Sequence, residues 1–580
     1  MKSFKFFIIA IFLLILICGN AAAQTRGGVQ QMAGSVPFSK GVNMTKWFEG
    51  TVWNAVEIHF RMFDESDFIF FKNIGVDVIR LPVNFHAMTS GAPNFIVDPL
   101  LFRLLDQVVD WAEKHQIYIV LDNHYYARVP APLNNIQPSP LTVARELPII
   151  WRQIADHFKN RSEYVLYEIF NEPNNITARQ WGQLQGQVID AIRSVDTKHT
   201  IVVSAVSHMD GVAFDSFEAL FSLPNYSDRN LIYTFHFYDP FIFTCQGAPP
   251  LNLLTGVPFP YDRNRMPPLP DTLRNTWVDH EMRAYENNSN LTSLTRKLNR
   301  VVEFSRRRNV PVFCGEFGVL YTVKSEDKNR WLQTITNLLN ERNIPWTIWE
   351  YSGHTSTSFG MFNTPNGNHF SELNVELARA IGFNPPPQRP RSTEALRSGF
   401  TIYDDYFGRD YWVWYPVSTN SDAKLHLFDT NAADGEFAIR WENPLSSRYD
   451  TIWIDNVYEQ NYSFLVQSGA YLEFKARTNK PVSINVLFLN PEIDSLIPWI
   501  MYFTVDSKVL PPDGRWHTIR IPLRNMTEQG GLQDVTYQWH NPRGQFTWNR
   551  INRIQIAMNN QLPDVPDATI WFDSIRIVRP

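Results

Sequence analysis

The sequence predicts an α/β chain in which a (β/α)8 TIM barrel is followed by an antiparallel β-sandwich of the jelly-roll type. Three observations support this prediction. Short β-branched runs alternate with amphipathic helical stretches from Ser39 to about Phe383, a proline-rich segment comes next, and the remaining chain has short alternating runs with little helical periodicity. Strands that alternate with helices form a parallel sheet, and eight such strands close a barrel.

The expected barrel strands share apolar, β-branched runs bounded by turn residues. They occupy 41–44, 76–81, 117–121, 164–170, 200–205, 231–236, 310–315 and 345–350. Helical periodicity predicts helices between them, such as 99–115, 141–159, 178–195, 291–308 and 327–342. An open doubly wound sheet is the competing fold, but such a sheet more often has a glycine-rich first turn, which this sequence lacks.

One long stretch, 240–290, is rich in Pro and Asn and predicts a loop insertion at the top of the barrel. Loops at that end of a barrel shape the substrate cleft. We therefore expect the insertion to influence which substrate binds.

The second domain follows a stiff linker. Residues 384–391 read Asn-Pro-Pro-Pro-Gln-Arg-Pro-Arg, and consecutive prolines favour extended polyproline II. We expect the barrel domain at 24–383, the linker at 384–397 and the β-sandwich at 398–580. The runs that predict sandwich strands include 436–441, 470–476, 483–488, 517–521, 554–557 and 569–578.

Residues 1–23 have the pattern of a secretory signal peptide. Lys2 and Lys5 precede the apolar run 6–18, and small residues that suit cleavage follow it. The run is shorter than a membrane span requires. Lipid attachment at Cys18 is the less favoured alternative, because a large residue precedes it. We expect a secreted protein, in the medium, at the cell surface or in the periplasm.

The composition argues against several classes of function. The chain has 580 residues, 19% of them charged, and its formal net charge of -5 gives no field that attracts nucleic acid or an anionic membrane. Cys245 and Cys314 follow the leader and are too few for a disulfide scaffold. No zinc-ligand spacing and no glycine-rich phosphate loop occurs in the sequence. We therefore expect no nucleic-acid partner and no metal at the site, and we also expect a monomer.

Polar residues recur where the expected barrel strands end, which is where such barrels carry their active sites. Two of them are glutamates that follow buried apolar strands, Glu172 and Glu316. A buried carboxylate is costly unless something uses it. Two carboxylates in one cleft are what glycosidic-bond cleavage requires, since one protonates the leaving oxygen and the other attacks or activates water. The strand-end set is Arg80, His124, Asn171, Glu172, His236, Tyr238, Glu316 and Trp349.

These motifs resemble the landmarks of glycoside hydrolase family 5, in the right order over about 340 residues. The resemblance is carried by Val165-Leu-Tyr-Glu-Ile-Phe-Asn-Glu-Pro-Asn174, Ile79-Arg-Leu-Pro82, Leu121-Asp-Asn-His124, His236-Phe-Tyr238, Gly315-Glu-Phe-Gly318 and Trp349. It implies retaining hydrolysis of β-linked glycans without a cofactor. It also implies an acid/base after the fourth strand and a nucleophile after the seventh.

In that reading Glu316 is the nucleophile and Glu172 is the acid/base. Arg80 and the Tyr238 hydroxyl are expected to keep Glu316 ionised by charge and hydrogen bonding. Burial and the charge of Glu316 are expected to raise the pKa of Glu172, so that it begins each cycle protonated. A lone strand-end glutamate is more often a salt-bridge or capping partner, and it is the complete set that favours catalysis.

The remaining residues are expected to bind or orient the sugar. Asn171 would hydrogen-bond the 2-hydroxyl, and Trp349 would form the floor on which the cleaved sugar stacks. His124 and His236 would orient the carboxylates and ring hydroxyls, although satisfied core histidines are the alternative. Asp122, close to His124 in sequence, fits barrel packing equally well and is not included in the expected site.

The C-terminal domain resembles jelly-roll carbohydrate-binding modules in two fragments, 514–522 and 570–576. Such modules bind glycans by stacking on exposed aromatics, or they can be purely structural; a structural calcium ion occurs in some of them. The aromatic candidates are Trp412, Trp414, Trp499, Trp539 and Trp548.

The resulting hypothesis is a secreted endo-β-glycanase whose polysaccharide substrate is a β-1,4-glucan. Mannan, xyloglucan or β-1,3-glucan hydrolysis by the same chemistry is the first alternative, because loops set the substrate. A non-catalytic glycan-binding protein on the same fold is the second. Loss of either carboxylate would mark that second alternative, and both are present.

Overall fold

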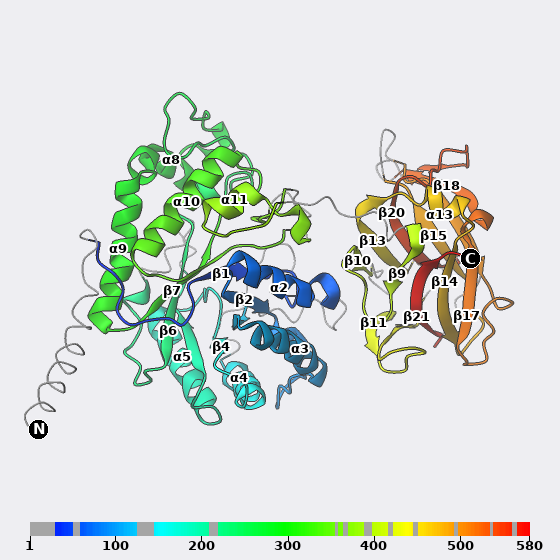
Figure 1. Ribbon diagram of the computed structural model, residues 1–580, viewed down its shortest axis with the longest axis horizontal. Helices are drawn as coiled ribbons and strands as arrows, with labels where there is room; N and C mark the ends of the chain where they lie inside the picture. The colour runs from blue at the N-terminus through cyan, green and yellow to red at the C-terminus, as the bar shows by residue number, and fades with distance from the viewer. Residues whose placement is uncertain are drawn as a thin grey trace, which may run out of the picture.

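The computed structural model describes residues 29–49, 58–124, 144–207, 219–353, 358–363, 369–387, 397–415, 422–444, 450–491, 497–533, 538–559, 565 and 567–580. The expected signal peptide at 1–23 and most of the expected linker lie outside these residues. The predicted fold class is confirmed: an eight-stranded parallel barrel is followed by antiparallel sheets (Figure 1).

The barrel strands follow one another in chain order and close with β1 beside β8. Each predicted strand is present, with ends shifted by a few residues. The strands are β1 (Lys40–Asn43), β2 (Val78–Val83), β3 (Tyr118–Asn123), β4 (Val165–Glu168), β5 (Thr200–Ser204), β6 (Leu231–Phe237), β7 (Val312–Phe317) and β8 (Trp346–Ile348).

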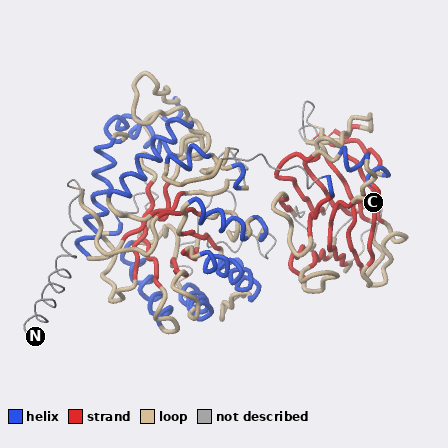
Figure 2. The backbone as a smooth tube through the Cα atoms, in the orientation of Figure 1, coloured by secondary structure: helices blue, strands red, loops and turns tan. Residues whose placement is uncertain are grey.

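The helices form the outer layer around these strands (Figures 1 and 2). They are α2 (Glu65–Ile74), α3 (Pro99–His115), α4 (Glu146–Phe158), α5 (Ala178–Arg193), α7 (Phe241–Thr244), α8 (Trp277–Asn288), α9 (Leu291–Arg308), α10 (Ser325–Glu341) and α11 (Val375–Ala380). Helix α3 illustrates why the periodicity identified them. Asp98 caps its first turn, Pro99 occupies the first helical position, and Leu101, Leu105 and Val108 lie on the face that is buried against the barrel.

The segment 240–290 is not a loop throughout, so that expectation was partly wrong. It contains α7, the short 3-10 helix Asp271–Leu273 and the three-turn helix α8. Thr276 caps α8 by accepting a hydrogen bond from the Val278 amide, and the buried Tyr285 hydroxyl donates to the Pro258 carbonyl at 2.6 Å. The polar composition of the segment concealed a helix that depends on these tertiary contacts.

The barrel interior changes character along its strands. Its amino-terminal end is closed by an apolar layer in which each side chain comes from a different strand or from the segment before β1: Phe38, Val78, Val120, Leu166, Val202, Ile232 and Phe313. Side chains of a strand return to the same face every second residue. The next inward layer therefore contains Arg80, Asp122 and Glu168, which are fully buried. The apolar floor excludes water beneath a charged layer.

The C-terminal domain is a β-sandwich, as predicted. One sheet has the order β10-β13-β20-β15-β16-β18-β19 and the other β11-β12-β21-β14-β17, with β9 paired to β21. The strands are β9 (Gly399–Tyr403), β10 (Tyr411–Trp414), β11 (Lys424–Asp429), β12 (Ala438–Glu442), β13 (Thr451–Gln460), β14 (Tyr471–Thr478), β15 (Ile484–Leu489), β16 (Ile500–Val505), β17 (His517–Pro522), β18 (Thr527–Gln533), β19 (Gln538–His540), β20 (Ile551–Met558) and β21 (Thr569–Val578).

The two domains touch. The 3-10 helix Phe60–Met62 and helix α2 of the barrel face the start of the sandwich, and the Phe60 and Tyr406 rings are 4.9 Å apart. A cavity of about 680 Å³ lies between the loop before α3 and strand β11. Both Cys245 and Cys314 are buried and free. No helix among the residues described here is long and apolar enough to cross a membrane.

Closure of the barrel depends on a glycine in β1. A Cβ at Gly41 would lie 1.7 Å from the backbone oxygen of Val78 on β2, whereas one at Gly91 would meet nothing within 4 Å. Gly41→Ala must separate β1 from β2, so we expect it to destabilise the barrel by about 2 kcal/mol or more. Gly91→Ala should change little. Thermal unfolding followed by calorimetry tests this, and equal melting temperatures for the two variants would contradict it.

Candidate active site

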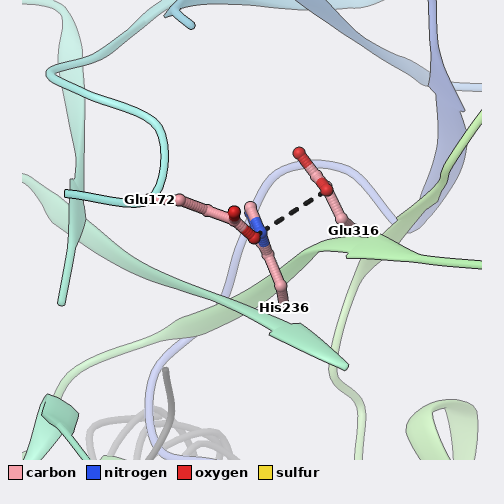
Figure 3. Close-up of side chains that lie close together, drawn as sticks. All are labelled: Glu172, His236 and Glu316. Atoms are coloured by element: carbon pink, nitrogen blue, oxygen red, sulfur yellow. Dashed lines mark hydrogen bonds and ion pairs between the residues drawn. The ribbon is translucent and has the colours of Figure 1, made fainter. Parts of the chain in front are cut away.

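The two strand-end glutamates face each other across the carboxyl end of the barrel. Glu172 lies in the loop after β4, Glu316 lies on β7, and His236 of β6 lies between them (Figure 3). One carboxylate oxygen of each glutamate and one nitrogen of His236 lie within 4.8 Å of one another. Retaining glycosidases separate their two carboxyl groups by about 5 Å, while inverting enzymes need more room for a water molecule. The spacing fits the retaining class.

A local irregularity turns Glu316 toward the interior. Strands β6 and β7 pair Phe235 with Cys314 but then His236 with Glu316, so Gly315 is an extra residue in β7. A Cβ at Gly315 would lie 2.6 Å from the Thr234 hydroxyl oxygen, which explains why this residue is glycine. The bulge brings the Glu316 carboxylate to the level of His236.

Glu172 has a strained backbone and a perturbed carboxyl group. Its φ of 36° is in the left-handed region that L-residues avoid, at a cost on the order of 1–3 kcal/mol. Burial raises the pKa of Glu172, although His124 and Arg80 oppose that effect. Its Oε1 lies 2.7 Å from Nδ1 of His236, and burial lowers the pKa of His236 to about 4. A neutral imidazole therefore lies against a carboxyl group that retains its proton above the ordinary range for Glu.

Arg80 lies beneath both glutamates, and its guanidinium contacts more polar groups than either glutamate does. Its guanidinium donates to Oε1 of Glu316 at 2.7 Å and to both oxygens of Glu168 at 2.7 and 2.8 Å. It also lies 3.0 Å from Asp122. Burial alone would lower the pKa of Arg80, but the charges of Asp122 and Glu168 raise it. The guanidinium is thus a fixed cation in contact with three carboxylates.

The other expected site residues are adjacent to these groups. The Tyr238 hydroxyl donates to Oε2 of Glu316 at 2.8 Å. Asn171 Oδ1 accepts from Arg80 at 2.9 Å, and its amide nitrogen is 3.3 Å from Nε2 of His124. The Trp349 ring stacks on the His124 ring, with centroids 5.2 Å apart and an interplanar angle of 8°.

A model of the cellulase family, glycosyl hydrolase family 5, matches residues 42–355, which is more than half of the chain. The chain belongs to this family. Endoglucanase 3 of Fibrobacter succinogenes is 28% identical over 342 residues, which are 55% of this chain and 50% of that protein. Endoglucanase C of Acetivibrio thermocellus is 26% identical over 361 residues, which are 59% of this chain and 99% of that protein.

This chain therefore spans half the length of the first relative and nearly all of the second. Among solved structures, the endoglucanase Cel5A of Thermotoga maritima is 23% identical, with a TM-score of 0.47 over 59% of this chain and 96% of that one. Residues 42–355 thus form a glycosyl hydrolase family 5 domain.

Two buried carboxylates of this family 5 hydrolase were missed from sequence. Asp122 Oδ2 contacts both Arg80 and Nδ1 of His124, the latter at 2.5 Å, and burial raises the pKa of Asp122 to about 7. Glu168 binds Arg80 with both oxygens, and burial raises its pKa. The available signal was strand alternation, since both residues lie two positions after an apolar residue of the barrel floor.

Two further buried glutamates lie at the edge of the site. Glu350 follows Trp349 and accepts hydrogen bonds from the Thr45 hydroxyl and the Phe359 amide. Glu49 follows β1, and its Oε1 has no hydrogen-bond partner among the residues the structure describes. Burial raises the pKa of both carboxyls. Glu350 is adjacent to Trp349 in the chain, and the charge of Glu49 acts to raise the pKa of His124, so both carboxyls lie close to expected sugar-binding residues.

Glu172, His236 and Glu316 are also spaced closely enough to hold a metal ion. Their contacts give these atoms other partners. Arg80 and Tyr238 already donate to Glu316, and His236 pairs with Glu172. A cation would have to compete with the Arg80 guanidinium, so this donor set fits proton transfer and nucleophilic attack better than metal binding.

The charge balance around Arg80 predicts a pH-dependent defect. Arg80→Met leaves Asp122, Glu168 and Glu316 buried without a cation, which should cost about 3 kcal/mol or more at neutral pH. Asp122 and Glu168 already have raised pKa values in the folded state, so folding favours their protonated forms. The variant should therefore be least destabilised at acid pH and lose stability as the pH rises through those pKa values.

Urea unfolding at acid and at neutral pH measures this effect. Arg274→Met is the matched control, because its ion pair with Asp271 is exposed to solvent. A defect in Arg80→Met that is equal at both pH values would contradict the prediction.

Proposed function

We propose that this family 5 hydrolase is a secreted, retaining endo-β-glycanase that cleaves β-1,4-glucan by double displacement. The observation that supports the mechanism is that a carboxylate oxygen of Glu172 lies within 4.8 Å of one of Glu316. The names of its relatives support the substrate, since endoglucanase 3 and endoglucanase C are both described as endoglucanases.

The first displacement forms a glycosyl-enzyme. A Glu316 oxygen bonds to the anomeric carbon, the bond from that carbon to the glycosidic oxygen breaks, and the Glu172 proton moves to the departing oxygen. Arg80 and Tyr238 occupy the two Glu316 oxygens in the free enzyme and orient the carboxylate for attack. Because His236 is neutral above pH 4, it places no positive charge against Glu172 that would expel its proton.

The second displacement releases the sugar. Once Glu316 is esterified, its negative charge is gone and Glu172 is ionised. Glu172 takes a proton from water, the water oxygen bonds to the anomeric carbon, and the ester bond to Glu316 breaks. Each displacement inverts the anomeric carbon, so the two together retain its configuration. Asn171 is oriented by Arg80 to bind the 2-hydroxyl, and the Trp349 face supports the ring.

Other β-glycans remain alternatives within this chemistry. Mannan, xyloglucan and β-1,3-glucan differ from β-1,4-glucan at positions that loops read, and the 240–290 insertion with helix α8 is one such region. A non-catalytic binding protein is disfavoured because both glutamates are present and adjacent.

We also propose that the sandwich binds glycan on the outer face of its seven-stranded sheet. Strand register places Trp414, Trp453, Gln555, Leu487 and Tyr502 in one row across β10, β13, β20, β15 and β16. Aromatic rings and an amide in a row suit stacking on sugar faces and hydrogen bonding to hydroxyls. Trp414 is 57% exposed.

The other candidate tryptophans differ in their surroundings. Trp539 is 45% exposed, and Trp499 is half-buried. Trp548 packs against the sandwich core, and Trp412 packs against the barrel, with its ring 5.3 Å from His59. Secretion, the monomeric state and a structural calcium ion in this domain remain predictions from sequence.

Two substitutions test the catalytic roles. Glu316→Gln should abolish hydrolysis of soluble β-1,4-glucan and of aryl cellobiosides alike, because no glycosyl-enzyme forms. Glu172→Gln should lower glucan hydrolysis by roughly 10²–10⁴-fold, and formation of the glycosyl-enzyme from aryl substrates by much less, since a phenolate leaves without a proton. It should also remove the alkaline limb of the pH profile of kcat/KM. In the wild type, kcat/KM should fall as the pH rises through the raised pKa of Glu172, because Glu172 loses the proton that it must donate.

Activity assays on glucans, mannans and xyloglucans with wild type and both variants provide the measurement. Hydrolysis that survives Glu316→Gln would remove the mechanism. Wild-type activity on mannan or xyloglucan alone would replace the substrate and leave the mechanism intact.

The sandwich face is tested in the Glu316→Gln background, where glucan is not degraded. Trp414→Ala should weaken retardation in glucan-containing gels by about threefold or more, because an exposed stacking surface is lost. Trp516→Ala is the control, since Trp516 packs on Arg477 of the other sheet. Equal mobility of the two variants would count against this binding face.

A further inference from the structure

One arginine of the sandwich contacts a buried aspartate of the barrel domain. Arg409 lies between β9 and β10, and its side chain is only 11% exposed. Its Nη2 lies 2.5 Å from Oδ2 of Asp67 and 3.1 Å from Oδ2 of Asp64, both at the start of barrel helix α2. Helix α2 is one of the barrel elements on the side toward the sandwich in Figure 1.

Asp67 is a buried charge that depends on this contact. It is fully buried, and its Oδ2 accepts a hydrogen bond from the Asp64 amide at 2.9 Å as part of the capping box of α2. Burial raises the pKa of Asp67 to about 6 even though Arg409 opposes the shift. Arg409 is also the largest opposing influence on that pKa. Its removal would leave a carboxylate buried with no cation beside it.

Asp67 connects to the active site through Tyr351. The Tyr351 hydroxyl is buried and has no hydrogen-bond partner among the residues that the structure describes, and after burial itself the charge of Asp67 is the main cause that raises its pKa. The Tyr351 ring is fixed between barrel side chains and lies 4.7 Å from the Phe71 ring of α2. Its backbone amide donates to the Asn43 carbonyl at 3.0 Å.

Tyr351 directly follows two site residues that come immediately after β8. Trp349, which stacks on His124, and the buried Glu350 immediately precede it. Asn43 in turn donates to the Gly315 carbonyl and accepts from Arg80, so the backbone partner of Tyr351 also touches the charged layer.

We propose that Arg409 is a positioning residue, through which the docked sandwich fixes the end of β8 in the catalytic barrel. Neutralisation of Asp67 holds the start of α2 in place, and with it the Phe71 ring that packs against Tyr351. Tyr351 then fixes Trp349 and Glu350 relative to His124 and Glu316. Without Arg409, Asp67 must take up a proton or move toward water, and either change alters the packing around Tyr351.

Another ion pair between the domains provides a matched control. Arg61 of the barrel contacts Asp404 of the sandwich at 2.5 Å, but the side chains are 42% and 46% exposed. This pair joins the same two surfaces without touching Asp67 or Tyr351. Arg61→Met therefore removes a domain contact and leaves the pathway to β8 intact.

The test compares full-length Arg409→Met, Arg409→Lys and Arg61→Met, assayed on soluble glucan, and it rests on the proposed function for its substrate. We expect Arg409→Met to lower kcat/KM by roughly tenfold, because small misplacements of site residues are costly, while Arg61→Met stays near wild type. Amide hydrogen exchange should rise at Trp349, Glu350 and Tyr351 in Arg409→Met only. Arg409→Lys retains the charge and should recover part of the activity.

Asp67→Asn separates this role from simple stability. In that background the buried charge is absent, so Arg409→Met should cost much less activity than it does in wild type. Loss that is equal in both backgrounds, or a lowered melting temperature with unchanged kcat/KM, would overturn the proposal. A wild type inactive on every glycan would instead refute the proposed function, and hydrogen exchange at β8 would still decide the role of Arg409.

Discussion

The buried cation of Arg80 is the interaction on which the active site depends. Asp122, Glu168 and Glu316 all lie against its guanidinium inside a barrel whose floor is apolar. Taken singly, each carboxylate would cost several kcal/mol to bury. Together with one arginine they form a fixed charge array that needs no reorganisation when substrate arrives. Such preorganisation is what electrostatic catalysis requires.

The two glutamates have different surroundings beside this charged array, and these surroundings suit them to different catalytic roles. Glu316 touches the guanidinium directly, at 2.7 Å, and receives the Tyr238 hydroxyl. Glu172 instead contacts neutral His236, and burial raises its pKa. One carboxylate is thus paired with a cation and the other with an uncharged ring. Glu172 also adopts a strained φ, which indicates that its position is held against a local conformational preference.

The sequence allowed prediction of the barrel and the strand-end residues because both follow from short-range pattern. Period-two strands and helical stripes are local, and such patterns place Glu172, Glu316 and Arg80 at expected strand ends, although Arg80 is the third residue of β2 and Glu172 lies in the loop after β4. Asp122 was left open because one charged residue inside a strand fits packing as well as catalysis, until Arg80 is known to face it. Helix α8 was missed because its burial depends on Tyr285 reaching Pro258. The Arg409–Asp67 contact joins residues 342 positions apart, a separation over which local pattern carries no information.

Arg80 and Arg409 are two uses of one device, an arginine that neutralises a buried aspartate or glutamate. They differ in where the arginine originates. Arg80 belongs to the barrel strand beside its partners, so its charge balance forms with the barrel itself. Arg409 belongs to the second domain, so the buried Asp67 carboxylate has this cation beside it only where the sandwich is docked. A barrel built this way has its charge balance completed by the second domain, and that dependence distinguishes a docked domain from one that is only tethered.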